Sequence, residues 1–155
     1  MTLSFVGHAL VPNFEKVKDI VKEQIKIALR SSGKLSCFLG GYGDFDELCA
    51  RACRELRQEY AEIELIYVTP YFDMTGQAKI EEMLKNGLYD TSIYPPLESV
   101  PPRYAILKRN YWMMENSDLI IAYVHRGFGG AFKTLEFAKR RNKKVINIAT
   151  ENELF

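Results

Sequence analysis

Cysteine and histidine are scarce in this chain of 155 residues, which contains three cysteines and two histidines. A small, odd number of cysteines argues against a disulfide framework. Two histidines without carboxylates at ligand spacing do not predict a metal site. We therefore expect Cys37, Cys49 and Cys53 to be small apolar packing residues in a reducing compartment, and we expect no metal and no cofactor.

Long apolar runs and an excess of one charge are missing as well. No apolar run approaches the length of a membrane-spanning helix, and the N-terminus lacks the basic and apolar regions of a signal peptide. Lys+Arg 21 against Asp+Glu 20 gives a formal net charge of +1, which is not the basic footprint typical of nucleic-acid-binding proteins. We expect a cytoplasmic protein with no membrane and no nucleic-acid partner.

Several signatures of nucleotide binding and covalent catalysis are absent. The glycines form no G-x-G-x-x-G fingerprint, and no Walker lysine follows them. No G-x-S-x-G elbow and no Cys–His pairing supports a covalent intermediate. The only sequence signal for a nucleotide site is therefore a pair of less specific glycine turns.

Short apolar runs alternate with segments of helical period, in a chain of ordinary composition with 47% hydrophobic and 26% charged residues. This alternation predicts an α/β fold, a three-layer Rossmann-like sandwich with a mostly parallel sheet of about five strands, in a single domain over 1–155. The expected strands are 2–6, 35–39, 63–68, 119–124 and 145–149, and the expected helices are 14–30, 45–58, 79–85, 103–116 and 131–141. We expect a long loop from Tyr89 to Pro102, because four of the six prolines fall between Pro95 and Pro102. The part from Pro95 to Pro102 is expected to cover a ligand.

Two glycine turns follow two of these strands, and each opens a helix. Such a turn presents bare backbone N–H groups and the positive end of a helix dipole to an anion. Because the carboxyl ends of parallel strands share one edge, other groups that follow strands join these turns. The candidate ligand-binding residues after strands are Gly7, His8, Gly40, Gly41, Gly43, Asp46, Tyr71, Gly129, Gly130, Thr134 and Glu136.

The helix expected over 103–116 adds three further candidates. Arg103 and Asn110 fall on one helical stripe, which predicts polar groups aimed at the pocket. Arg109 points elsewhere on the wheel, but its place beside Asn110 keeps it a candidate for phosphate.

Each candidate also has an interpretation that needs no ligand. Glycines favour tight turns, and an acidic residue near the start of a helix complements its dipole, which applies to Asp46 and Glu136. His8 and His125 are equally well explained as structural histidines. These alternatives stay open at the level of the sequence.

Several motifs together resemble the SLOG superfamily of LOG- and DprA-like Rossmann-like proteins, in its YspA/YpsA-related branch. The resemblance spans most of the chain, from Gly7-His8 to Ile148, and it implies a pocket for a nucleotide or a nucleotide derivative. The motifs are Phe38-x-Gly40-x-x-Gly43-x-Phe45-Asp46, Val100-Pro-Pro-Arg-Tyr-Ala-Ile-x-x-Arg-Asn110, Asn116-Ser-Asp118, Gly129-Gly130-Ala131 and Lys139-Arg-Arg-x-Lys-x-Val-Ile-Asn147.

The resemblance extends to the LOG phosphoribohydrolases, which remove a base from a nucleoside monophosphate. Their motif is similar to Gly129-Gly-x-x-x-Thr134-x-Glu136, which implies Glu136 as the catalytic carboxylate. Phe128 stands where those enzymes have a proline, and Phe132-Lys133 replaces a Gly step. Gly41 also stands where a polar residue is usual in the closer relatives.

These features lead to a main hypothesis and two rivals. The main hypothesis is a protein that binds, or senses, a nucleotide or nucleotide-derived ligand through both glycine turns. The rivals are an N-glycoside hydrolase that uses Glu136, and an adaptor domain whose pocket has decayed. A homo-oligomer that pairs through Trp112, Met113 or Met114 is a further option, and a core position for these residues is the alternative.

Overall fold

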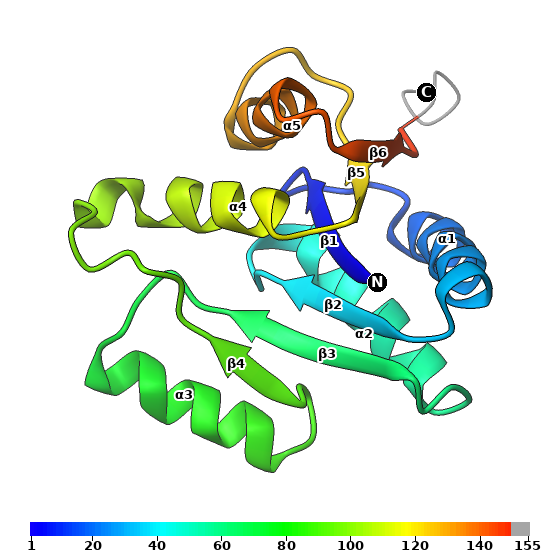
Figure 1. Ribbon diagram of the computed structural model, residues 1–155, viewed down its shortest axis with the longest axis horizontal. Helices are drawn as coiled ribbons and strands as arrows, with labels where there is room; N and C mark the ends of the chain where they lie inside the picture. Colours follow the sequence, from blue (N-terminus) through cyan, green and yellow to red (C-terminus); the bar gives the residue numbers. More distant parts are fainter. Residues whose placement is uncertain (150–155) are drawn as a thin grey trace.

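A six-stranded parallel sheet forms the centre of the molecule in the computed structural model, which describes residues 1–149 (Figure 1). The strand order is β4-β3-β2-β1-β5-β6. The strands are β1 (Thr2–Gly7), β2 (Leu35–Leu39), β3 (Ile63–Val68), β4 (Thr91–Ile93), β5 (Leu119–Tyr123) and β6 (Lys144–Asn147). The helices are α1 (Phe14–Ser32), α2 (Gly43–Arg57), α3 (Met74–Lys85), the 3-10 turn η1 (Pro102–Tyr104), α4 (Ala105–Glu115) and α5 (Gly130–Arg140).

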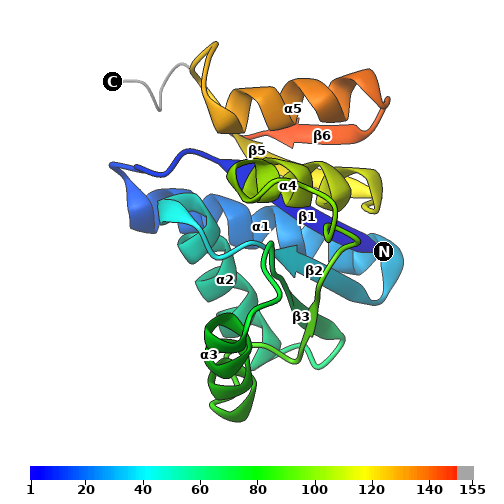
Figure 2. The ribbon, with the colours of Figure 1, turned by 90° about the vertical axis from the view of Figure 1, so that its left-hand side faces the viewer.

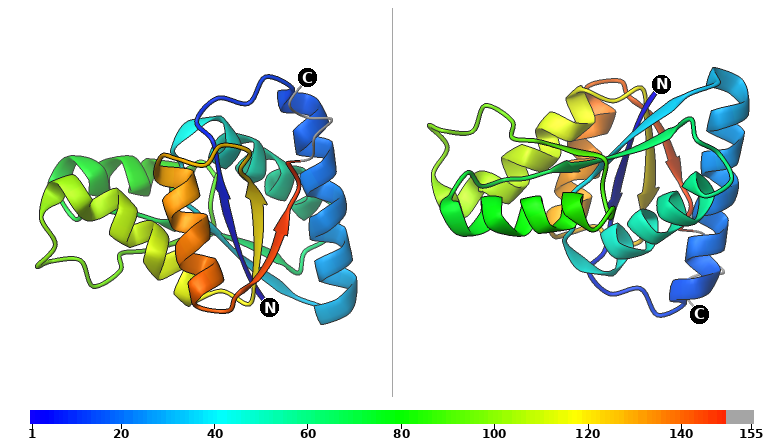
Figure 3. Two further views of the ribbon diagram at one scale, coloured as in Figure 1. Left: turned by 90° about the horizontal axis from the view of Figure 1, so that it is seen from above. Right: turned by 90° about the horizontal axis from the view of Figure 1, so that it is seen from below.

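Helices cover both faces of the sheet, and each face has its own apolar core. Residues of α1 and α2 pack with one set of strand side chains, including Leu3, Leu65 and Ile121. Residues of α4 and α5 pack with the opposite set, including Val6, Val68 and Ile120. Figure 3 shows α4 and α5 on one side of the sheet and α1 on the other. The three-layer Rossmann-like sandwich expected from the sequence is confirmed.

The sheet has six strands rather than about five, because β4 lies inside the stretch expected to be a loop. β4 has only three residues, which pair with β3 from Ile66↔Thr91 to Val68↔Ile93, and none of them is fully buried. A short edge strand of this kind has no apolar run to reveal it. Helix α3 also begins at Met74 rather than Lys79, because the carboxylate of Asp73 caps its first turn by accepting the Gly76 N–H at 2.6 Å.

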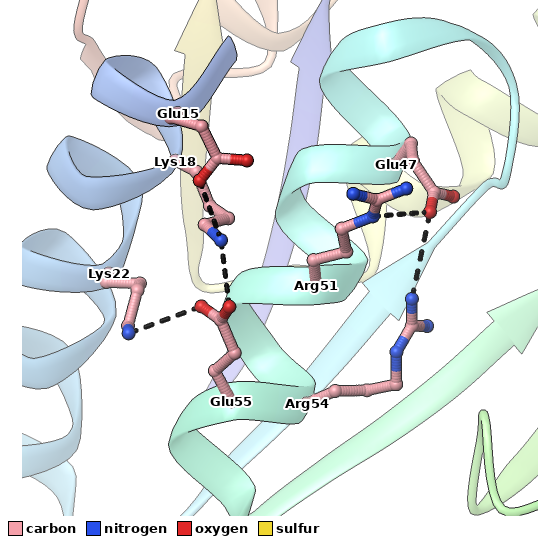
Figure 4. A network of polar contacts seen from close by, with 7 residues as sticks. All are labelled: Glu15, Lys18, Lys22, Glu47, Arg51, Arg54 and Glu55. Carbon is pink, nitrogen blue, oxygen red and sulfur yellow. Dashed lines mark hydrogen bonds and ion pairs between the residues drawn. The ribbon is translucent and has the colours of Figure 1, made fainter.

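A network of ion pairs fastens α1 to α2 (Figure 4). Lys18, only 8% exposed, donates to Glu55 Oε1 at 2.8 Å, and its Nζ also lies 3.0 Å from Glu15 Oε2. Lys22 Nζ lies 3.2 Å from the other oxygen of Glu55. The hydrogen bonds to Glu55 and Glu15 raise the pKa of Lys18, and those from Lys18 and Lys22 hold the pKa of Glu55 below its usual value. These ion pairs thus contribute to the packing of α1 against α2.

The order of the strands reverses direction at β1. The chain builds the sheet outward from β1 through β2 and β3 to β4, and then returns to place β5 and β6 on the other side of β1. The connections that leave β1 and β5 therefore diverge, and they open a crevice at the carboxyl ends of these strands. In Figure 2 β1 runs from right to left, and this edge lies toward the left of the picture. Among the helices of residues 1–149, none is long and apolar enough to cross a membrane.

Candidate functional site

A cavity of about 230 Å³ opens at this reversal of strand order. Its walls come from the end of β1, the turn before α2, the middle of α4 and the turn before α5. The lining residues are Phe5, Val6, Gly7, His8, Ala9, Tyr42, Asp46, Ile106, Arg109, Asn110, Arg126, Phe128, Gly129, Gly130 and Ala131. We call this the first cavity.

A second cavity, of about 420 Å³, lies beside it at the ends of β2 and β3. Both cavities have Tyr42, Ile106 and Arg109 in their walls. The remaining lining residues of the second cavity are Gly40, Gly41, Tyr67, Thr69, Pro70, Tyr71, Asp73, Thr75, Gly76, Lys79, Ile80 and Met83. The two cavities are therefore neighbours with a common wall.

Arg109 is the central residue of this common wall. It reaches from α4 to the carboxyl ends of two strands, where Nη1 donates to Gly40 O at 3.0 Å and Val68 O at 2.7 Å. Nε donates to Asn110 Oδ1 at 2.9 Å. A Cβ at position 40 would lie 3.0 Å from the Arg109 Cζ, so glycine at Gly40 makes room for the guanidinium.

The charge of Arg109 is buried without an opposite charge in contact. The residue is 1% exposed, and within residues 1–149 its guanidinium makes no ion pair with a carboxylate. Burial lowers the pKa of Arg109, and the negative charge of Asp46 counteracts this through space. Nη2 has no hydrogen-bond partner in the described part of the chain. A buried guanidinium in this state favours an anion in the adjoining cavity.

His8 holds the turn after β5 against the end of β1. Its Nε2 accepts the backbone N–H of His125 at 3.0 Å, so the neutral ring carries its proton on Nδ1. Burial, followed by the charges of Arg126 and His125, lowers the pKa of His8 to about 4. His8 is therefore neutral near pH 7 and acts as a structural acceptor.

Arg126 was not among the residues expected from the sequence, yet it lines the first cavity. Its Nη2 lies 3.1 Å from Nδ1 of His8. Because Nδ1 carries a proton, this contact brings two donors together and gives Arg126 no hydrogen bond. The guanidinium also lies over the ring of Phe128, with Cζ 5.4 Å from its centroid. Arg126 is thus an exposed cation with donors free for a ligand.

Helix α5 opens onto the same cavity. No side chain caps its N-terminus at Gly129, and no acidic residue lies in its first turn. Its first N–H groups carry the partial positive charge of the helix dipole. Two arginines and an uncapped helix N-terminus make the first cavity an electropositive pocket.

Asp46 supplies a carboxylate to the first cavity from the first turn of α2. Its Oδ2 accepts the backbone N–H of Tyr42 at 2.9 Å. Burial raises the pKa of Asp46 to about 6, although the Tyr42 hydrogen bond and the charge of Arg109 both act to lower it. With a pKa of about 6, Asp46 is mostly ionised at neutral pH and takes up a proton in mild acid.

The first glycine turn is explained by packing within the protein. A Cβ at Gly41, where φ is +70°, would lie 2.7 Å from the Tyr67 ring. The first N–H groups of α2 are already used, because Asp44 donates to Ala9 O at 2.9 Å and Phe45 to His8 O at 3.3 Å. This turn contributes a wall to both cavities, but these N–H groups are not available to a phosphate.

The second glycine turn has no such explanation. An added Cβ at Gly127, Gly129 or Gly130 would meet no atom within 4 Å. Gly129 has a φ of +92°, which favours glycine, but Gly130 is helical and has open space around it. A glycine that neither φ nor packing requires is consistent with close approach of a ligand.

Four of the expected site residues lie outside the lining of both cavities: Gly43, Arg103, Thr134 and Glu136. Thr134 is fully buried, and its hydroxyl donates to Gly130 O at 2.9 Å within α5, so it is not free to bind a ligand. Glu136 lies 3.6 Å from Lys139 Nζ on the same helix. Arg103 is exposed in η1, over the ring of Tyr104. The expected cover from Pro95 to Pro102 also contributes no residue to either cavity.

The helical stripe of α4 that faces the cavities differs from the one expected. Ile106, Arg109 and Asn110 form this wall, so Arg109 points inward and Arg103 does not. The options for an oligomer interface change as well, because Met113 and Met114 are buried in the core and Trp112 packs against Phe38. The sequence showed an arginine in the turn after β5, but not that Arg126 faces the cavity.

Comparison with known proteins identifies the fold of the chain but does not assign the chain to a family. No protein-family model and no curated protein matches the chain. A structure of DNA processing protein A (DprA) from Streptococcus pneumoniae is similar, with a TM-score of 0.62 and 12% identity over 93% of this chain and 48% of that one. A structure of the Helicobacter pylori DprA, concerned with its single-stranded DNA binding mode, gives a TM-score of 0.56 and 17% identity over 94% and 63%.

These likenesses define the class of fold: a Rossmann-like α/β domain that spans less than two thirds of either DprA chain. They show the Rossmann-like fold that the resemblance to the SLOG superfamily implies, while membership of the superfamily and of its YspA/YpsA-related branch stays a prediction. The net charge led us to expect no nucleic-acid partner. This expectation is wrong, because the Helicobacter pylori DprA, which has a similar fold, binds single-stranded DNA.

Proposed function

We propose that this domain binds a nucleotide or nucleotide-derived ligand, with the phosphate in the first cavity. The observation that carries the proposal is Arg109, a guanidinium that is 1% exposed, has no carboxylate in contact within residues 1–149 and lines the cavity. Removing a counter-charge from a buried ion costs several kcal/mol, and a bound anion restores it. The buried, free cysteines agree with a reducing compartment such as the cytoplasm.

The surroundings of Arg109 fit a phosphate better than a carboxylate or a halide. A phosphate offers several acceptor oxygens, which can be shared between Arg126, the open N-terminus of α5 and the free Nη2 of Arg109. Gly130 leaves space for such a group beside the helix. Asn110 lines the same cavity, and its Oδ1 already accepts a hydrogen bond from Arg109. Its NH₂ group therefore faces the ligand as a donor.

Binding is favoured over N-glycoside hydrolysis by the position of the carboxylates. Asp46 is the one carboxylate among the described residues that line the first cavity. Glu136, to which the resemblance assigns catalysis, lies outside the lining and beside Lys139. Without a carboxylate placed by α5, the geometry offers binding groups but not the expected catalytic one.

A calorimetric titration with the four common nucleoside monophosphates tests this proposal. We expect binding that weakens about tenfold in Arg126→Ala, because a hydrogen bond to a charged group contributes about 1.5–3 kcal/mol. Arg103→Ala is the matched control: it removes an arginine that lies outside both cavities, and it should bind like the parent. No heat and no thermal stabilisation with any of the four would overturn the proposal and leave the adaptor rival.

Single-stranded nucleic acid is a second candidate, because aromatic side chains stand exposed along this edge. Tyr42, Tyr71, Phe72 and Phe128 are between 41% and 69% exposed, and Arg126 lies among them. Exposed rings beside cations are the platform on which successive bases stack. Fluorescence anisotropy with a labelled single-stranded oligonucleotide tests this candidate. Phe72→Ala should weaken oligonucleotide binding and leave mononucleotide binding unchanged, since Phe72 lines neither cavity.

A further inference from the structure

The second cavity has no role in phosphate binding, yet it is the larger of the two. We propose that it receives the base of the bound nucleotide, so that the ligand spans both cavities across the wall formed by Arg109 and Tyr42. This inference rests on the proposed function, because it assigns the remainder of the same ligand. It predicts that a substitution in the second cavity can weaken recognition of the base and leave recognition of the phosphate unchanged.

The chemistry of the second cavity suits a planar aromatic group. Tyr42, Tyr67 and Tyr71 contribute three aromatic rings to its walls, and Ile80 and Met83 contribute apolar surface. Aromatic and apolar walls with a few polar groups are the usual lining of small-molecule sites, which measure about 300–1,000 Å³. The volume of about 420 Å³ falls in this range. The first cavity also has Tyr42 and Phe128 in its lining, but it is the one that holds Arg126 and the N-terminus of α5, which suit the phosphate.

The walls of the second cavity are fixed by the scaffold. Gly41 packs so closely on Tyr67 that any side chain at position 41 would collide with the ring. The other side of Tyr67 contacts the Tyr89 ring, with centroids 5.2 Å apart. The hydroxyl of Thr69 donates to Tyr71 O at 3.0 Å and accepts from Tyr71 N at 3.3 Å, which holds the backbone under the Tyr71 side chain. Tyr71 is nevertheless 41% exposed and lines the cavity, so part of its side chain is accessible to a ligand.

The common wall gives the ligand a defined direction. Arg109 belongs to both cavities, and its Nη1 is tied to the strand ends while Nη2 has no described partner. A phosphate on the α5 side therefore places the sugar near Arg109 and Tyr42, and the base continues toward α3. Lys79 on α3 lines the far side and provides a cationic donor for acceptor atoms on the edge of the base.

Steric blocking of the second cavity tests the inference. Thr75 is exposed and lines only the second cavity, so Thr75→Trp fills the base site without touching the first cavity. Glu82→Trp is the matched control, since Glu82 is exposed on the same helix and lines neither cavity. Tyr71→Ala provides a second, smaller change that removes one stacking surface. The probes are the four nucleoside monophosphates, ribose 5-phosphate and inorganic phosphate, titrated by calorimetry.

We expect Thr75→Trp and Tyr71→Ala to weaken binding of the preferred nucleoside monophosphate by about tenfold or more, the effect of losing one base-stacking contact. Ribose 5-phosphate and inorganic phosphate lack a base, and their weaker binding should be the same in the parent and all variants. If the nucleotide binds the parent and both variants equally, the inference is overturned while the proposed function stands. If no probe binds the parent protein, the proposed function fails and the inference fails with it.

Discussion

Replacing Asp46 with asparagine should make the protein more stable at neutral and alkaline pH and leave it unchanged in acid. The substitution keeps the side-chain oxygen that accepts the Tyr42 N–H and removes the charge. Burial raises the pKa of Asp46 from 3.8 to about 6 in the folded protein. The folded state therefore holds this proton more tightly than the unfolded chain, so stability falls as the pH rises from about 4 to 6.

The magnitude follows from the size of this shift. A difference of about two pKa units corresponds to about 3 kcal/mol of unfolding free energy above pH 6, at about 1.36 kcal/mol per unit. Asp46 is only partly buried in the open cavity, so solvent screens its charge and we expect about 1–3 kcal/mol. For a domain of this size, about 2–4 °C of Tm accompanies each kcal/mol, which gives a stabilisation of about 2–12 °C.

Urea denaturation of the parent and of Asp46→Asn between about pH 4 and pH 8 measures the effect. The difference in unfolding free energy should be near zero at the acid end, grow through the region of pH 5–6 and level off above about pH 7. His8 titrates in the opposite sense, because its lowered pKa of about 4 makes stability rise between about pH 4 and 6.5. That contribution is common to both proteins and cancels in the difference. A difference that does not change with pH would refute the reasoning.

Two further predictions concern the glycine turns and the helix pair. Gly41→Ala should destabilise the fold by about 1–3 kcal/mol in urea denaturation, because the new side chain is strained at φ +70° and collides with Tyr67. Gly130→Ala should fold normally, because the position has open space, and it should weaken phosphate binding in calorimetry. Equal stability loss in both would contradict the assignment of the two turns. Glu55→Gln should cost up to about 1 kcal/mol at pH 7. This loss should shrink as the pH falls below the usual value of 4.5, because the ion pairs hold the pKa of Glu55 lower in the folded state; a loss that persists at pH 3 would point to packing.

The fold could be predicted because the signal for it lies within short segments. The apolar runs at 35–39 and 119–123 coincide with buried parallel strands, and glycines mark the turns that follow them. The strand at 91–93 could not be recognised, since its pairing with β3 depends on tertiary contact and its three residues are only half-buried. Local pattern predicts the central strands of such a sheet better than its edge.

The site was harder to predict from the sequence than the fold, because its chemistry depends on which elements pack against one another. Two glycine turns look alike in sequence, but the N–H groups after Gly43 are occupied by the carbonyls of His8 and Ala9, which arrive from β1. The turn at Gly129 meets no such neighbour. The rotation of α4 also sets whether Arg109 faces the core or solvent, and the periodicity of this helix does not distinguish the two. Tertiary contact therefore decides which candidates can reach a ligand.

Net charge was a poor predictor of binding partners, because it does not show which charged residues form ion pairs. Lys18 and Lys22 both pair with Glu55 between α1 and α2, and Arg141 pairs with Glu115 on the opposite face. Arg109 and Arg126 make no ion pair within residues 1–149, and both line the first cavity. A total of +1 therefore does not reveal that two cations without an ion pair line one cavity. An anion-binding site requires unpaired cations in one place, and Arg109 and Arg126 lie together where the strand order reverses.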